Sequence, residues 1–105
     1  MNQAVELLKH LLPVIRSSFD DYHDYTQTVT LEYENGLVDE IHNPCPTDAN
    51  ALKNGIYESI LRNTKLGLSP IKATVKDYGT IYAGDAGSSG FYVHVCTPEG
   101  VTRIK

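Results

Sequence analysis

A chain of 105 residues is long enough to bury one hydrophobic core without disulfides or a structural metal, so we expect one domain over residues 1–105. Hydrophobic residues make up 41% of the chain and charged residues 21%, a composition that argues against a disordered protein. The formal charge of −4, with lysines and arginines scattered along the chain, argues against direct binding to nucleic acid. The apolar runs are too short to span a membrane and the N-terminus does not resemble a signal peptide, so we expect a cytoplasmic protein with no membrane partner.

The N-terminal segment predicts a helix with a wide apolar face. At Pro13, where one backbone donor is missing, we expect either a kink or an end and restart of the helix. Two neighbouring apolar stripes repeat at helical spacing. The first stripe contains Val5, Leu8, Leu12, Ile15 and Phe19, and the second contains Ala4, Leu7, Leu11 and Val14. Since so wide an apolar arc needs two neighbours, we expect one stripe to pack on a sheet and Leu7, Leu11 and Val14 to bind a protein partner or a second copy in a homodimer. The alternative is that the second stripe packs under the C-terminal strands.

Alternation of apolar and polar residues predicts a β-hairpin over residues 28–41. A three-residue loop that ends in a left-handed Gly36 places Val29 opposite Ile41 and keeps most apolar residues on one side. Asp39 is the one polar residue that this register places among them. A two-residue loop would expel several apolar residues instead, so we prefer the longer loop.

A second helix is predicted to begin after a cap at Thr47 or Asp48 and to end near Gly67. Its predicted buried face contains Leu52, Ile56, Tyr57, Ile60 and Leu61. Gly55 disfavours a helix, so its presence inside this one indicates close backbone packing or weak selection for helix stability.

Four strands are predicted after this helix, over residues 71–76, 80–83, 91–96 and 101–104. Asp77-Tyr78-Gly79 is predicted to be a turn that places Tyr82 opposite Thr74. The expected fold class is α+β, a two-layer sandwich with a mostly antiparallel sheet, element order α-β-β-α-β-β-β-β and both helices on one face.

The glycine-rich stretch over residues 84–90 is the first candidate ligand site. A loop of this composition exposes backbone N–H groups that can hold an anion, although it matches no known phosphate motif. The candidate ligand-binding residues in it are Gly84, Asp85, Gly87, Ser88 and Ser89. Tyr82, Tyr92 and His94 share one strand face in the predicted register and form a possible aromatic floor beneath it. A mobile hairpin tip and an outer, half-solvated sheet face are the corresponding structural interpretations.

A metal site is a weaker hypothesis. His42 and Cys45 lie close together in a loop, and His94 and Cys96 lie on one face of a strand, so the four are ligand types that zinc accepts. Their spacing is not that of a structural zinc motif, so we expect no metal and no cofactor, with the cysteines acting as small buried hydrophobes.

The link between the first helix and the first strand is rich in carboxylates and phenols. Its candidate partner-binding residues are Asp20, Asp21, Tyr22, Asp24 and Tyr25. Adjacent residues in an extended link rarely converge on one metal or substrate, whereas exposed tyrosines are favoured at protein interfaces. A solvated acidic face is the alternative interpretation of the same stretch.

Two functions follow from these features. The first is a small acidic, non-enzymatic interaction protein, such as an inhibitor, an immunity or anti-defence protein or a regulatory adaptor, that self-associates through the first helix and binds a macromolecular partner. The second is a small-ligand or nucleotide-binding domain that uses the stretch from Gly84 to Gly90 with Tyr82, Tyr92 and His94. No catalytic motif is recognised in the sequence.

Overall fold

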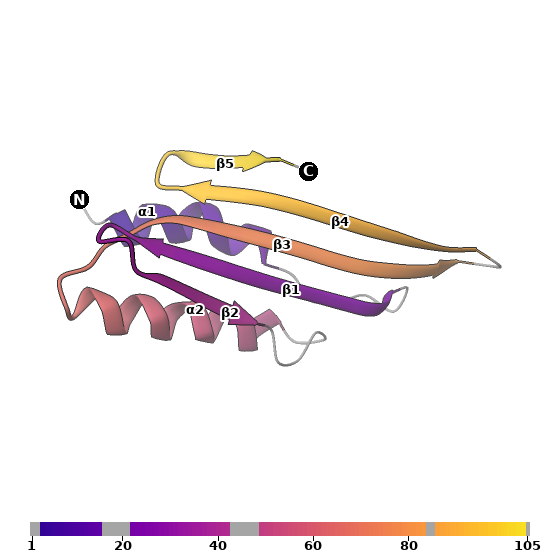
Figure 1. The fold of residues 1–105 in the computed structure, drawn as a ribbon, viewed down its shortest axis with the longest axis horizontal. Helices are drawn as coiled ribbons and strands as arrows, with labels where there is room; N and C mark the ends of the chain where they lie inside the picture. Colours follow the sequence, from indigo (N-terminus) through magenta and orange to yellow (C-terminus); the bar gives the residue numbers. More distant parts are fainter. Residues whose placement is uncertain (1–2, 16–21, 43–48, 84–85, 105) are drawn as a thin grey trace.

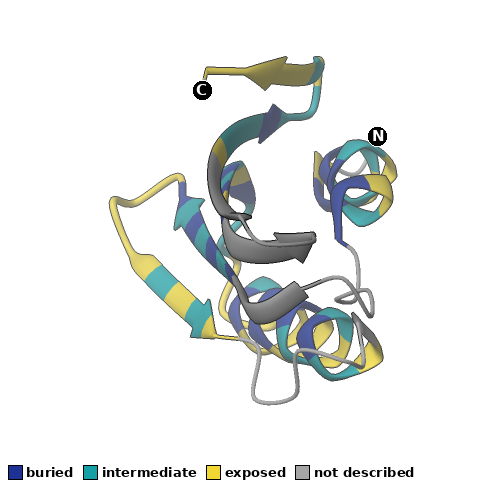
Figure 2. Cartoon of the chain, turned by 90° about the vertical axis from the view of Figure 1, so that its right-hand side faces the viewer, coloured by how far each residue is buried: buried dark blue, intermediate teal, exposed yellow. Residues whose placement is uncertain are grey.

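The computed structural model describes residues 3–15, 22–42, 49–83 and 86–104. Its elements are α1 (Gln3–Leu11), the 3-10 helix η1 (Leu12–Val14), β1 (Tyr22–Tyr33), β2 (Val38–His42), α2 (Ala49–Thr64), β3 (Pro70–Ala83), β4 (Ala86–Thr97) and β5 (Gly100–Arg103) (Figure 1). The strands form one antiparallel sheet in the order β2-β1-β3-β4-β5. The sheet is curved and both helices lie on its concave side (Figure 2). The predicted α+β class and two-layer arrangement are therefore confirmed.

The core lies between the helices and the concave face of the sheet. Its buried residues are Ala4, Leu7, Leu11, Val14, Ile15, Val29, Leu31, Tyr33, Leu52, Ile56, Ile60, Ala73, Val75 and Cys96. Alternate residues of β1 and β3 supply the sheet half of this core, as the period of two in those strands requires. The molecule extends over 52 × 24 × 20 Å, because β1, β3 and β4 continue well beyond the helices at one end (Figure 1).

The β1–β2 hairpin has the predicted loop and register. The N–H of Gly36 donates to the carbonyl of Tyr33 over 3.0 Å, and Gly36 has a φ of +89°, a left-handed conformation in which glycine is favoured. Val29 pairs with Ile41, and Asp39 pairs with Leu31, as the sequence predicts. The turn composition and the alternation of apolar residues therefore agree with the observed pairing.

The prediction of a turn at residues 77–79 is wrong. β3 runs without interruption to Ala83, so three strands rather than four follow α2. Tyr82 pairs with Gly87 and not with Thr74. The reason is that β1 begins at Tyr22 and pairs with β3 along nearly its whole length, which keeps residues 77–79 in the sheet.

The assignment of the second stripe of α1 to a partner interface is also wrong. Leu7 and Leu11 are 0% exposed and Val14 is 9% exposed, because α1 packs on β3 and β4 through this stripe. Val5, from the first stripe, is 52% exposed. The predicted alternative, in which the second stripe packs under the C-terminal strands, is the one observed.

α2 ends close to the predicted place. Its last residue is Thr64, and Gly67 then adopts a φ of +80° while its N–H donates to the carbonyl of Thr64. Gly55 faces the sheet so closely that a Cβ atom there would lie 2.8 Å from Cγ2 of Ile41, which confirms the expectation of close packing. Tyr57 and Leu61 were predicted to be buried, but their exposed fractions are 45% and 58%.

Candidate functional site

An apolar groove lies between residues of the two helices, α1 and α2. We call it the helix groove; its volume is about 320 Å³ and it is lined by Ala4, Val5, Leu8, Tyr57, Ile60, Leu61 and Thr64. Among the lining residues, only Thr64 and Tyr57 carry a hydroxyl group, so the lining is almost entirely hydrocarbon. Surface hydrophobic residues are normal when scattered, but a continuous patch of them indicates a site of interaction.

On α2, a lysine stands before and another after the apolar residues that line the helix groove. Lys53, Tyr57 and Leu61 recur every four residues along α2, so each lies close to the next on its surface, and Lys65 follows Leu61 by the same interval just after the helix ends at Thr64. On α1, Lys9 follows Val5 by the same interval. Lysines therefore flank the apolar residues of the helix groove in the sequence of both helices, although the chain as a whole has a formal charge of −4.

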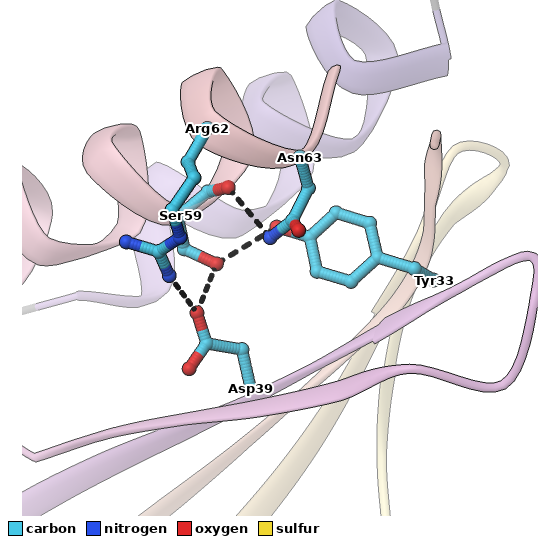
Figure 3. Close-up of polar contacts among 5 residues, drawn as sticks. All are labelled: Tyr33, Asp39, Ser59, Arg62 and Asn63. Carbon is cyan, nitrogen blue, oxygen red and sulfur yellow. Dashed lines mark hydrogen bonds and ion pairs between the residues drawn. The ribbon is translucent and has the colours of Figure 1, made fainter. Parts of the chain in front are cut away.

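A polar network that is only partly buried fixes α2, and with it one wall of the helix groove, to the β1–β2 hairpin (Figure 3). The hydroxyl of Ser59 donates to Oδ2 of Asp39, and the Arg62 guanidinium donates to the same oxygen over 2.9 Å. Because the only proton of the Ser59 hydroxyl goes to Asp39, the hydroxyl of Tyr33 is the donor in its 2.8 Å contact with Ser59. Asn63 adds a bond from its side chain to the Ser59 carbonyl.

A second polar cluster lies across the concave face beyond the end of α1. The side-chain amide of Gln27 donates to Oδ1 of Asp77 over 2.5 Å and to the Val14 carbonyl over 3.1 Å. Oδ2 of Asp77 lies 3.9 Å from Nδ1 of His94, and this buried ring nitrogen has no hydrogen-bond partner among the described residues. Because the Asp77 carboxylate and the Val14 carbonyl can only accept hydrogen bonds, the NH2 group of Gln27 must point toward them, which fixes the orientation of its side-chain amide.

Two further side chains belong to the same end of the concave face. Tyr92 pairs with Asp77 across β3 and β4, and Arg103 pairs with His94 across β4 and β5, so all four share one face. The guanidinium carbon of Arg103 lies 4.7 Å from the centre of the Tyr92 ring, a cation–π contact. Tyr92 and His94 thus lie on one face, which is the helix-bearing face and includes the buried Cys96. The prediction that Tyr82 shares this face is wrong, because its register position on β3 is five residues from that of Asp77 and so belongs to the opposite face.

The glycine-rich stretch is not the loop that the sequence predicts. Residues 86–90 belong to β4, where Gly87 pairs with Tyr82, Ser88 with Ile81 and Ser89 with Thr80. A strand paired in this way cannot wrap its successive N–H groups around one anion, so the proposed anion nest is wrong for these residues. Gly84 and Asp85 lie outside the described residues.

The candidate partner-binding residues fall into two groups. Leu7, Leu11 and Val14 lie in the core and are not accessible to a partner. Asp20 and Asp21 lie outside the described residues, and 22–25 are described only as backbone of β1. The accessible apolar residues near the predicted interface are instead Val5 and Leu8, from the other stripe of α1.

The four potential zinc ligands are not brought together as predicted. His42 pairs with Thr28 on the convex side of the sheet, whereas His94 lies on the concave side with β1 and β3 between the two strands. His42 instead contacts Glu40, with 2.8 Å between Nε2 and Oε1. Cys45 lies outside the described residues, and within them no three potential ligands gather around one point.

Cys96 is a free, fully buried thiol whose Sγ lies 3.9 Å from the carbonyl oxygen of His10. Burial disfavours the thiolate and raises the pKa of Cys96 from 9.0 to about 11. The side chain is therefore a neutral hydrophobe at pH 7 and has none of the character of a reactive cysteine.

Comparisons with protein families, with characterised proteins and with solved structures found no match for this chain. In the described part of the chain, neither helix has the length and apolar character needed to cross a membrane. The interpretation of the surface therefore depends on its physical chemistry.

The sequence contains a signal for the helix groove that the apolar periodicity of α2 obscures. The four-residue repeat of Lys53, Tyr57, Leu61 and Lys65 lies beside the narrower apolar row of Leu52, Ile56 and Ile60. Assigning every apolar residue to the core hid the second row. The flanking lysines, which are rarely buried, mark it as a surface row.

Proposed function

We propose that this is a non-enzymatic interaction protein, of the inhibitor or regulatory adaptor kind, whose helix groove binds an acidic amphipathic helix of a partner protein. The observation that carries the proposal is the continuous exposure of Val5, Tyr57 and Leu61, at 52%, 45% and 58%, along one groove. An isolated domain gains nothing in folding stability from apolar side chains that stay in water. Burying them against a partner supplies a favourable free energy of association.

The charges around the helix groove determine the chemistry of the partner. Lysines precede and follow Tyr57 and Leu61, and Lys53 and Lys65 are 12 residues apart, a span of about 18 Å at the rise of a helix. A helix with apolar residues at intervals of three and four and carboxylates at both ends matches this length and charge. Acidic groups on the partner would also accelerate the encounter through electrostatic attraction.

The test is a selection from a displayed library of helical peptides. Peptides are selected on the wild-type protein and counter-selected on a Tyr57→Asp, Leu61→Asp double variant. We expect the enriched peptides to share an apolar stripe with acidic ends and to bind the double variant at least about tenfold more weakly, a change of roughly 1.4 kcal/mol or more. Leu66→Asp is the matched control, because Leu66 is 72% exposed but does not line the helix groove.

Two results would contradict the proposal. The first is a selection in which no peptide distinguishes the wild type from the double variant. The second is enrichment of peptides whose binding is lost equally in the Leu66→Asp control. Circular dichroism of all three proteins shows whether each variant retains its fold.

A second candidate function is small-ligand or nucleotide binding at the concave end of β4. The observation that favours it is the grouping of Tyr92, His94 and Arg103, which offers an aromatic ring, an imidazole and a guanidinium on one face. A nucleotide needs a planar surface for its base and cations for its phosphates. Thermal shift measurements with a panel of nucleotides test this function, and any stabilisation should disappear in Tyr92→Ala and in Arg103→Ala.

A further inference from the structure

β4 is much longer than the strand beside it. β5 pairs only with residues 94–97 of β4, and the last bond between them runs from the N–H of Ile104 to the carbonyl of Val93 over 2.8 Å. From Ala86 to Tyr92, β4 has β3 on one side, and among the described residues no strand lies on its other side (Figure 1). This part of β4 is an open sheet edge.

The backbone groups that face the open edge can be identified. Because the Val93 carbonyl points toward β5, every second residue before it, namely Phe91, Ser89 and Gly87, directs its N–H and C=O toward the same side. The residues between them bond to β3. The open edge therefore presents three residues with both a donor and an acceptor, spaced to pair with another antiparallel strand.

The sequence of the open edge has none of the devices that normally prevent pairing. Residues 86–93 read Ala-Gly-Ser-Ser-Gly-Phe-Tyr-Val, without a charged residue or a proline. Natural proteins protect exposed edges with lysine, proline, bulges or inward-pointing charges. The opposite edge of this sheet, β2, carries Asp39, Glu40 and an ion pair between Glu40 and His42. The two edges of the sheet therefore differ in their suitability for pairing.

We propose that the open edge of β4 pairs with the same edge of a second copy of this chain, around a two-fold axis at Ser89. A strand that runs antiparallel to its own copy satisfies two-fold symmetry without further adjustment. The axis at Ser89 places Gly87 opposite Phe91 of the second copy and leaves the Val93 carbonyl bonded to Ile104. The two five-stranded sheets would join into one continuous sheet.

The absence of charge on this edge allows two copies of the chain to meet there without like-charge repulsion. Each chain carries a formal charge of −4, so most surfaces of two copies repel each other weakly. Residues 86–93 are uncharged, and pairing them places no like charges directly opposite one another. This self-association is separate from the helix groove, so either proposal can fail without the other.

The experiment measures the oligomeric state of the full chain by sedimentation velocity over a range of concentrations. The wild type should form a dimer. Ser89→Pro should weaken dimerisation by at least about tenfold, because proline removes an outward N–H and leaves the bonds to β3 in place. Glu40→Pro is the matched control. The bond from the Tyr33 N–H to the Leu37 carbonyl shows that odd-numbered residues of β2 bond to β1, so the backbone groups of even-numbered residues point away from the sheet. Glu40→Pro therefore removes one unpaired N–H from the opposite edge. The control should remain a dimer.

A second variant and a second measurement keep the test decisive if proline disturbs the fold. Ser89→Lys places two positive charges at the axis and should also give a monomer with an unchanged circular dichroism spectrum. Hydrogen exchange should show slow exchange of the Ser89 and Phe91 amides in the wild type and fast exchange in Ser89→Lys. A wild type that stays monomeric would overturn the proposal, and so would a dimer that persists in both Ser89 variants. A monomer that binds an extended foreign peptide at this edge would also overturn it.

Discussion

Asp39 on β2 accepts a hydrogen bond from Ser59 of α2, and this contact accounts for the one polar residue on the apolar side of the β1–β2 hairpin. In a hairpin considered alone, Asp39 opposite Leu31 is a mismatch. The helix resolves it by providing a hydroxyl and, from Arg62, a guanidinium. A charged residue in a half-buried position is thus stabilised by donors that only the tertiary fold brings near.

Ser59→Ala should lower the free energy of unfolding by about 2 kcal/mol, because the buried Tyr33 hydroxyl loses its partner and Asp39 loses one of two donors. Urea denaturation monitored by circular dichroism measures the change. Arg62→Ala is the comparison, since the Arg62 side chain is 62% exposed and its ion pair should contribute less than about 1 kcal/mol. A larger loss for Arg62→Ala than for Ser59→Ala would contradict this order.

Gly55→Ala should destabilise the protein by about 1 kcal/mol, although alanine favours a helix by nearly the same amount. The new Cβ would lie 2.8 Å from Cγ2 of Ile41, and a β-branched side chain has few ways to move that methyl group. Combining Gly55→Ala with Ile41→Ala should cost less than the sum of the two single changes, as measured by thermal unfolding. Additive losses would show that the two residues do not interfere.

Gln27→Glu should destabilise the protein at pH 7 more than Gln27→Ala does. The glutamate would place a second carboxylate against Oδ1 of Asp77, and two carboxylates at that separation repel strongly. Protonation of the introduced glutamate at low pH would remove this repulsion, so the difference between the variants should shrink as the pH falls. Unfolding curves at several pH values test this, and a difference that does not change with pH would contradict the expected repulsion.

Cys96 should react slowly with thiol reagents in the folded protein, because its pKa is raised from 9.0 to about 11 and the side chain is buried. A raised pKa means that the folded state favours the neutral thiol, so this contribution to stability is full below pH 9 and is lost as the pH rises toward about 11. The rate of labelling in a Cys45→Ser background, with and without urea, measures the protection. Equal rates in both conditions would show that Cys96 is accessible.

The β1–β2 hairpin could be predicted in detail because its information is local. The position of Gly36 determines the loop, and alternating apolar residues allow one register that keeps Val29 and Ile41 on the core side. The end of α2 was predicted for a similar reason, since Gly67 is a strong local signal for a helix terminus.

The β3–β4 hairpin could not be predicted in the same way. Gly79 and the glycines of residues 84–90 are all compatible with a turn, and glycine is equally permitted in an extended strand. The choice between them depends on β1, whose residues 22–27 pair with the far half of β3. The two strands are far apart in the sequence, so their pairing cannot be detected from the pattern of apolar and polar residues within either strand.

The two stripes of α1 illustrate a related limit. Val5 and Leu7 are both apolar and both belong to plausible helical faces, so periodicity alone does not say which face meets the sheet. The observed orientation places Leu7 in the core and Val5 in the helix groove. The same ambiguity, applied to α2, concealed the exposed positions of Tyr57 and Leu61.

The central pairing of β1 with β3 has a consequence for the order in which the protein folds. Gln27 and Asp77 are neighbours in this pair although they are 50 residues apart in the chain, with β2 and α2 between them. Closing so long a loop costs conformational entropy before any contact is gained. We therefore expect the β1–β2 hairpin and α2 to form first, and the docking of β3 against β1 to limit the folding rate.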